Sequence, residues 1–100
     1  MLNKYFKTED EHEVVDIYEF FNYYNTFFFE GRLERCYVEW SQRMTLCAGT
    51  CTHSSHQSCT IRLSAPILKY RTANELKETL LHEMIHAFLF LTNPSACLDH

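Results

Sequence analysis

Two histidines and a glutamate stand at a spacing that suits metal-dependent hydrolysis. The stretch LLHEMIHA places His82 four residues before His86, with Glu83 between them. On a helix, residues four apart lie on one face one turn apart, so both imidazoles can bind one metal ion. Zinc accepts such nitrogen ligands at about 2.0–2.1 Å. Glu83 can reach a water on the ion, so the pattern H-E-x-x-H indicates a zinc hydrolase with a carboxylate as its general base.

Apolar residues surround these three side chains on the expected helix. They are Leu76, Leu80, Leu81, Met84, Ile85, Phe88, Leu89, Phe90 and Leu91. A helix that is apolar on every side is expected to be buried. A chance pair of surface histidines is the alternative, but burying two imidazoles and a carboxylate costs several kcal/mol unless a partner compensates. We therefore favour a metal site on a buried helix.

The composition predicts one small folded domain. The chain has 100 residues, of which 46% are hydrophobic, and its two Gly and two Pro do not suit a disordered or repetitive chain. Residues 1–10 are polar and are expected to be flexible, which leaves residues 11–100 as the domain. A net charge of −4 is unlike the basic surface of a strong DNA-binding protein.

Cysteine usage and hydropathy predict an intracellular protein. Five cysteines are an odd number for a disulfide framework, and the start MLNKYFKTEDEHE lacks the apolar core of an export signal. No apolar run reaches the about 18 residues that a membrane-spanning helix needs. We therefore expect reduced cysteines, no secretion and no membrane association.

Hydrophobic spacing before the metal helix predicts one helix and a sheet. Apolar residues recur every three or four positions from about Glu11 to Phe29, which indicates a helix with one buried stripe. Alternation then indicates strands over residues 34–41, 44–52 and 58–64, joined by short polar turns. Neighbouring strands joined in this way are expected to form an antiparallel meander.

Local signals set the bounds of the helix that carries the histidines. Thr72 and Glu75 fit a capping box, and Asn93-Pro94 stops the pattern, so the helix is expected from about residue 73 to 91. The fold class is therefore α+β, with an N-terminal helix, a three-stranded antiparallel sheet and a buried metal helix.

A second group of metal-binding residue types lies in the strand region. It comprises Cys47, Cys51, His53, His56 and Cys59. Sulfur and imidazole together can form a structural zinc site, but the C-x-x-C spacing of zinc knuckles is missing. The alternative, which we favour, is that the cysteines are small buried residues of the sheet.

The sequence resembles the SprT-like metalloproteases, and within them the Spartan type, which cleaves proteins crosslinked to DNA. The matching segments are FFNYYNTFFFEGRLE, VEWSQRMTLCAGTC, CTIRLSAPILKYR and ELKETLLHEMIHAFLFLTN, within residues 14–93. Four segments in the family's order are far more specific than H-E-x-x-H alone. The resemblance implies a zincin-like core and a zinc endopeptidase with His82 and His86 as ligands and Glu83 as base. It also implies a nuclear protein that acts on DNA-bound proteins and is switched on by DNA.

Two features depart from the family's pattern. The third zinc ligand of the family is a histidine flanked by glycines, and the resemblance assigns this role to His100, which follows Leu98-Asp99 instead. A terminal histidine without a metal role is the alternative. The family's later helices and the basic DNA-binding module of Spartan proteins are absent from these 100 residues, so we expect the domain to be incomplete at its C-terminal end.

Three functions remain open from the sequence. The first is a protease whose substrates are proteins, expected to be DNA-bound. The second is a truncated, non-catalytic relic or isoform that acts only through its surface, which the acidic charge of −4 favours. The third is a hydrolase of small substrates with the same zinc helix. The intact Glu83 favours an enzyme, because a relic does not need a general base.

Overall fold

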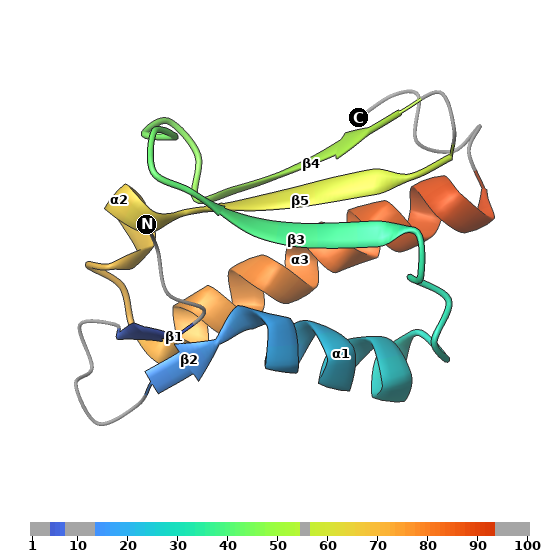
Figure 1. The fold of residues 1–100 in the computed structure, drawn as a ribbon, viewed down its shortest axis with the longest axis horizontal. Coiled ribbons are helices and arrows are strands. Elements are labelled where there is room, and N and C mark those ends of the chain that lie inside the picture. Colours follow the sequence, from blue (N-terminus) through green and yellow to red (C-terminus); the bar gives the residue numbers. More distant parts are fainter. Residues whose placement is uncertain (1–4, 8–13, 55–56, 94–100) are drawn as a thin grey trace.

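A three-stranded sheet lies over two long helices (Figure 1). The structure, a computed structural model, describes residues 5–7, 14–54 and 57–93. In chain order, the elements are β1 (Tyr5–Lys7), β2 (Val14–Asp16), α1 (Ile17–Phe28), β3 (Cys36–Ser41), β4 (Gly49–His53), β5 (Cys59–Ser64), α2 (Ala65–Leu68) and α3 (Ala73–Thr92). The sheet of β3, β4 and β5 packs on α3, and α3 packs on α1. The α+β class with an N-terminal helix is therefore confirmed.

The first helix begins later than the sequence pattern predicts. The pattern extends from residue 11, but Val14–Asp16 form β2, which pairs antiparallel with β1, and α1 starts at Ile17. Asp16 sets this boundary, because its carboxylate accepts hydrogen bonds from the backbone N–H groups of Tyr18 at 3.0 Å and Glu19 at 3.3 Å. The β-branched valines before this cap favour extended backbone. The strand β1 was not predicted from the sequence.

The predicted antiparallel meander is wrong, because the sheet is mixed. The strand order is β3-β5-β4, in which β3 pairs parallel to β5 and β4 pairs antiparallel to β5. The second strand is also shorter than the expected 44–52, since it starts only at Gly49. β5 is the most continuously buried of the three strands. Its central position in the sheet therefore removes more apolar surface from water than an edge position would. Alternation specifies the face of each residue, but it does not specify which strands are neighbours.

The core lies between this sheet and α3. Cys59, Ile61 and Leu63 of β5 face inward and are at most 1% exposed, as the alternation in the sequence predicts. On α3, Leu76, Leu80 and Met84 are fully buried against them. α3 is not buried on every side, however, because Ile85 is 45% and Leu89 is 43% exposed. The expectation of a fully buried metal helix is therefore corrected to one buried stripe.

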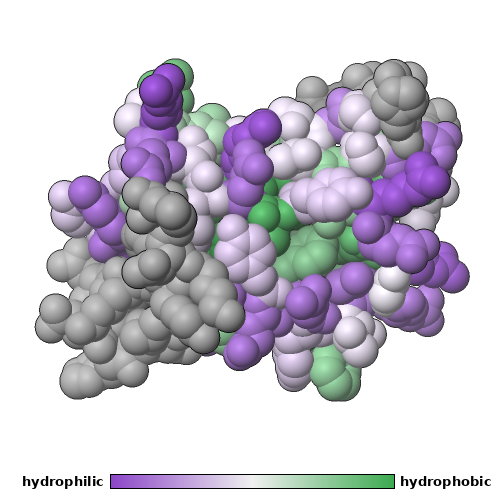
Figure 2. Space-filling model, in the orientation of Figure 1, coloured by the Kyte–Doolittle hydropathy of each residue, from purple (hydrophilic) through white to green (hydrophobic). Residues whose placement is uncertain are grey.

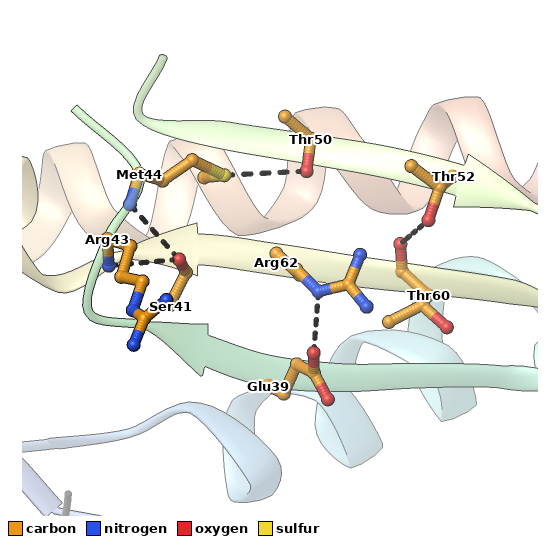
Figure 3. Close-up of polar contacts among 8 residues, drawn as sticks. All are labelled: Glu39, Ser41, Arg43, Met44, Thr50, Thr52, Thr60 and Arg62. Carbon is orange, nitrogen blue, oxygen red and sulfur yellow. Dashed lines mark hydrogen bonds and ion pairs between the residues drawn. The ribbon is translucent and has the colours of Figure 1, made fainter. Parts of the chain in front are cut away.

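Polar contacts link neighbouring strands on the outer face of the sheet (Figure 3). Arg62 of β5 donates through Nε to Glu39 of β3 at 2.6 Å, and these two residues are register partners. On the other side, Thr52 of β4 donates to the Thr60 carbonyl at 3.4 Å. The loop after β3 is held by Ser41, whose Oγ accepts from the Met44 N–H at 3.2 Å. These contacts hold the outer face while the inner face packs on α3.

The ends of α3 agree with the sequence prediction. Thr72 is the N-cap, and its Oγ1 accepts a 3.1 Å hydrogen bond from the Glu75 N–H. The helix ends at Thr92 with Asn93 as C-cap, one residue beyond the predicted end. Within the described residues, neither α3 nor any other helix is long and apolar enough to cross a membrane.

Candidate metal and catalytic site

The two histidines of the H-E-x-x-H pattern converge on α3. Their Nε2 atoms are 3.1 Å apart, and the ring centroids are 4.6 Å apart with the ring planes nearly perpendicular. Two nitrogen ligands of one tetrahedral zinc ion lie about 3.3 Å apart, given Zn–N distances of about 2.0–2.1 Å. The spacing of His82 and His86 therefore fits a shared ion, with both Nε2 atoms as the donors.

Glu83 points to a different side of the helix from His82. Its side chain is buried under β4, with the residue only 9% exposed, whereas His82 is exposed and His86 is half-buried. This corrects the expectation that both imidazoles are buried together with the carboxylate. The arrangement leaves the imidazoles accessible and holds the carboxylate between α3 and the sheet.

A cleft of about 370 Å³ opens between α3 and the start of β4. It is lined by Ala48, Gly49, Glu75, Glu78, Thr79, His82 and Glu83. His82 and Glu83 thus lie in one concave site, as a hydrolytic centre requires. Glu75, Glu78, Thr79 and His82 follow the spacing i, i+3, i+4, i+7, so the sequence contained the signal for this helix face. Gly49 could not be found in this way, because its place depends on the strand order.

A second hollow, of about 300 Å³, lies between α1 and β3. Its lining is mostly apolar and aromatic, with Tyr18, Phe21, Asn22, Cys36, Tyr37 and Val38. Figure 2 shows apolar side chains at the centre of this face, surrounded by hydrophilic ones. No histidine or carboxylate lines the hollow, so its described residues do not form a hydrolytic site.

The cysteines and histidine of the sheet do not assemble as a metal site among the described residues. Cys36 and Cys59 are register partners on β3 and β5, and Cys51 on β4 contacts Cys59. Burial, and then the neighbouring Cys59, raises the pKa of Cys36 to about 12. Burial, and then Cys59, Cys36 and the nearby Glu83 carboxylate, also raises the pKa of the Cys51 thiol. Both shifts come mainly from burial, which agrees with cysteines that are packed in the sheet.

The remaining members of that cluster lie elsewhere. Cys47 is exposed in the loop before β4. His53 stacks on Phe90, with 4.0 Å between the ring centroids, and His56 lies outside the described residues. In the described part of the chain, no group of three or more His, Cys, Asp or Glu side chains is placed to hold a metal ion. His100, the expected third zinc ligand, also lies outside the described residues.

Comparison with known proteins finds similarity over most of the chain. The profile of the SprT-like family matches residues 17–100. The DNA-dependent metalloprotease SPRTN of Rattus norvegicus is 56% identical over 79 residues, which are 78% of this chain and 16% of the rat protein. The human SPRTN is 54% identical over the same length. The DNA-dependent metalloprotease dvc-1 of Caenorhabditis elegans is 48% identical over 80 residues, or 22% of its own length. The chain therefore spans less than a quarter of these relatives, whose names imply a metal cofactor.

Proposed function

Because this chain belongs to the SprT-like family, we propose that it carries the catalytic half-site of a zinc-dependent endopeptidase. The single observation that supports this function is the placement of three side chains on one helix. The Nε2 atoms of His82 and His86 converge to 3.1 Å, and Glu83 lines the same cleft as His82. This is the donor set and base of a zincin-like core.

Zinc would be held by His82 and His86, with His100 as the proposed third ligand. The donor set of neutral imidazoles suits zinc, and the observed separation of the two Nε2 atoms needs little adjustment. When bound, zinc supplies a Lewis acid that polarises the scissile carbonyl and lowers the pKa of the attacking water to about 7.

Glu83 would act as the general base and then as the general acid. Its carboxylate accepts a proton from the attacking water and later donates that proton to the leaving amine. Packing between α3 and β4 restricts the side chain, since Glu83 is only 9% exposed. A restricted carboxylate is an advantage here, because a base that is already in position loses little entropy in the transition state.

The substrate would bind as an extended peptide along β4. β4 is at one edge of the sheet, and among the described strands it has no neighbour on its outer side. The start of β4 lines the cleft through Gly49, so a peptide added to this edge would pass His82 and Glu83 on α3, which line the same cleft. Backbone hydrogen bonds of this kind bind a peptide with little dependence on its sequence.

We further propose nuclear protein substrates that are bound to DNA. The support is the name that these relatives share, DNA-dependent metalloprotease, together with their identity of 48–56% to this chain. The rival proposal is a non-catalytic relic that acts only through its surface. Its support is the acidic net charge of −4, which gives these residues little attraction for DNA.

The test combines zinc content with proteolysis of casein, with and without single-stranded DNA. We expect one zinc per chain and cleavage in the wild type. Glu83→Gln should keep its zinc and lose at least about 100-fold in cleavage, because general base catalysis contributes about 10²–10⁴-fold. Cleavage that persists in Glu83→Gln contradicts the role of Glu83.

Two histidine variants and one control separate the ligands from the fold. His86→Ala and His100→Ala should each lose zinc, whereas His53→Ala, at the histidine that stacks on Phe90, should retain it. Zinc retained by His100→Ala would exclude His100 as the third ligand. A wild type with neither zinc nor cleavage would favour the non-catalytic alternative.

A further inference from the structure

Gly49 lies at the start of β4, where the backbone approaches α3 closely. A Cβ atom at this position would be 2.9 Å from Thr79 Cγ2, 3.1 Å from Glu83 Cγ and 3.3 Å from Leu63 Cδ2. Ordinary van der Waals contact between carbon atoms is about 3.5–4.0 Å, so a methyl group at position 49 would push on all three neighbours. The absence of a side chain is therefore a packing requirement at this position.

The three neighbours differ in how easily they can move. Thr79 donates a 2.8 Å hydrogen bond from Oγ1 to the Glu75 carbonyl, and rotation of its Cγ2 would break that bond. Leu63 is 0% exposed within the core, where close packing leaves no space for displacement. Glu83 is unbranched and has rotatable bonds beyond Cβ. Of the three, the Glu83 side chain can therefore move most readily, so a methyl group at position 49 would push it away from β4 in addition to clashing with Thr79.

We propose that Gly49 is a positioning residue, which holds the Glu83 carboxylate in its catalytic orientation because its backbone takes the space of a side chain. This inference rests on the proposed function of Glu83 as general base. The strand forms one wall against the Glu83 stem, and α3 forms the other. Because the stem of Glu83 is held on both sides, its carboxylate end is the part that can reach the cleft. Gly49 and Glu83 both line this cleft.

Gly49→Ala tests this role in the full chain. We expect kcat on casein to fall by at least about tenfold, because misplacement of a catalytic group by about 1 Å can cost about 100-fold. KM should stay within about twofold, and zinc content should be unchanged, because the three atoms nearest to a Cβ at position 49 belong to Thr79, Glu83 and Leu63 and to neither histidine. A kcat within twofold of wild type would overturn the proposal.

Gly31→Ala is the matched control. Gly31 has φ +72°, and a Cβ atom there would meet nothing within 4 Å, so this glycine is needed for its backbone conformation and not for space. We expect Gly31→Ala to lower the melting temperature by several degrees and leave kcat unchanged. An equal loss of kcat in both variants would mean that general destabilisation is the cause, and it would contradict positioning by Gly49.

A measurement independent of activity separates this inference from the proposed function. Unfolding is followed for wild type, Gly49→Ala, Glu83→Ala and the double variant. Since Glu83→Ala removes Cγ, Gly49→Ala should lower the melting temperature less in that background than in the wild type. Equal shifts in both backgrounds would overturn the inference, whether or not the chain cleaves protein. If Gly49→Ala does not fold alone, a folded double variant supports the inference and an unfolded one contradicts it.

Discussion

Replacement of Ser64 by alanine should destabilise the fold by more than its small size suggests. Ser64 is fully buried, and its Oγ donates a 2.6 Å hydrogen bond to the Met44 carbonyl in the loop before β4. The same oxygen accepts a 3.1 Å bond from the Ile67 N–H as N-cap of α2. Loss of an N-cap costs about 0.5–2 kcal/mol, and loss of a buried hydrogen bond costs about 0.5–1.5 kcal/mol or more. We therefore expect a loss of about 2–3 kcal/mol.

Thermal unfolding monitored by circular dichroism measures this loss. For a domain of about 100 residues, 1 kcal/mol corresponds to about 4–8 °C, so the melting temperature should fall by about 10–20 °C. Ser54→Ala is the matched control, because Ser54 is exposed and its Oγ lies 2.7 Å from Ser58 Oγ at the surface. We expect the control to change stability by less than about 0.5 kcal/mol. A similarly small change in Ser64→Ala would refute the assigned role of its two hydrogen bonds.

Two further predictions concern the buried thiols and the cap of α3. Burial, and then Cys59, raises the pKa of Cys36 from 9.0 to about 12. The contribution of the protonated Cys36 thiol to the free energy of unfolding is therefore complete below pH 9 and is lost as the pH rises toward 12. In denaturant unfolding, this thiol should lower the free energy of unfolding by about 1 kcal/mol between pH 8 and pH 10. The total decrease over this pH range should be smaller in Cys36→Ala than in the wild type. Equal decreases in the two proteins would contradict the assignment. Thr72→Ala should lower the free energy of unfolding by about 1 kcal/mol, measured by thermal unfolding, because the Glu75 N–H loses its acceptor. Thr72→Ser keeps a hydroxyl at the N-cap and should not lower it. A serine variant as unstable as the alanine variant would exclude capping as the cause.

Local sequence signals predicted the parts of the fold that depend on neighbouring residues. The cap at Thr72 and the stop at Asn93 gave the bounds of α3 to within one residue. The alternation from Cys36 to Trp40 gave the inner and outer faces of β3 correctly. These features were predictable because hydrogen bonds to neighbouring N–H groups and the two-residue period of a strand are properties of a short segment.

Features that depend on distant segments were not predicted. The parallel pairing of β3 with β5 joins residues 23 positions apart, such as Cys36 and Cys59, and alternation carries no information about that choice. The contact of Gly49 with Glu83 follows from the same strand order, since it requires β4 at the edge next to α3. His82 and His86 were predicted as a pair from their spacing, but the exposure of His82 depended on how α3 rotates against the sheet.

The strand order also has a consequence for how the chain folds. β4 and β5 are joined by a short turn, so His53 and Cys59 pair after only six residues and this hairpin can close within microseconds. β3 is synthesised before β4 and β5, yet it must wait until β5 has emerged before it has a partner. Once β5 has emerged, and until β3 docks on it, one side of β5 lacks its neighbour and is open to strands of other chains. The risk of aggregation during synthesis is therefore concentrated in the period between formation of the hairpin and docking of β3.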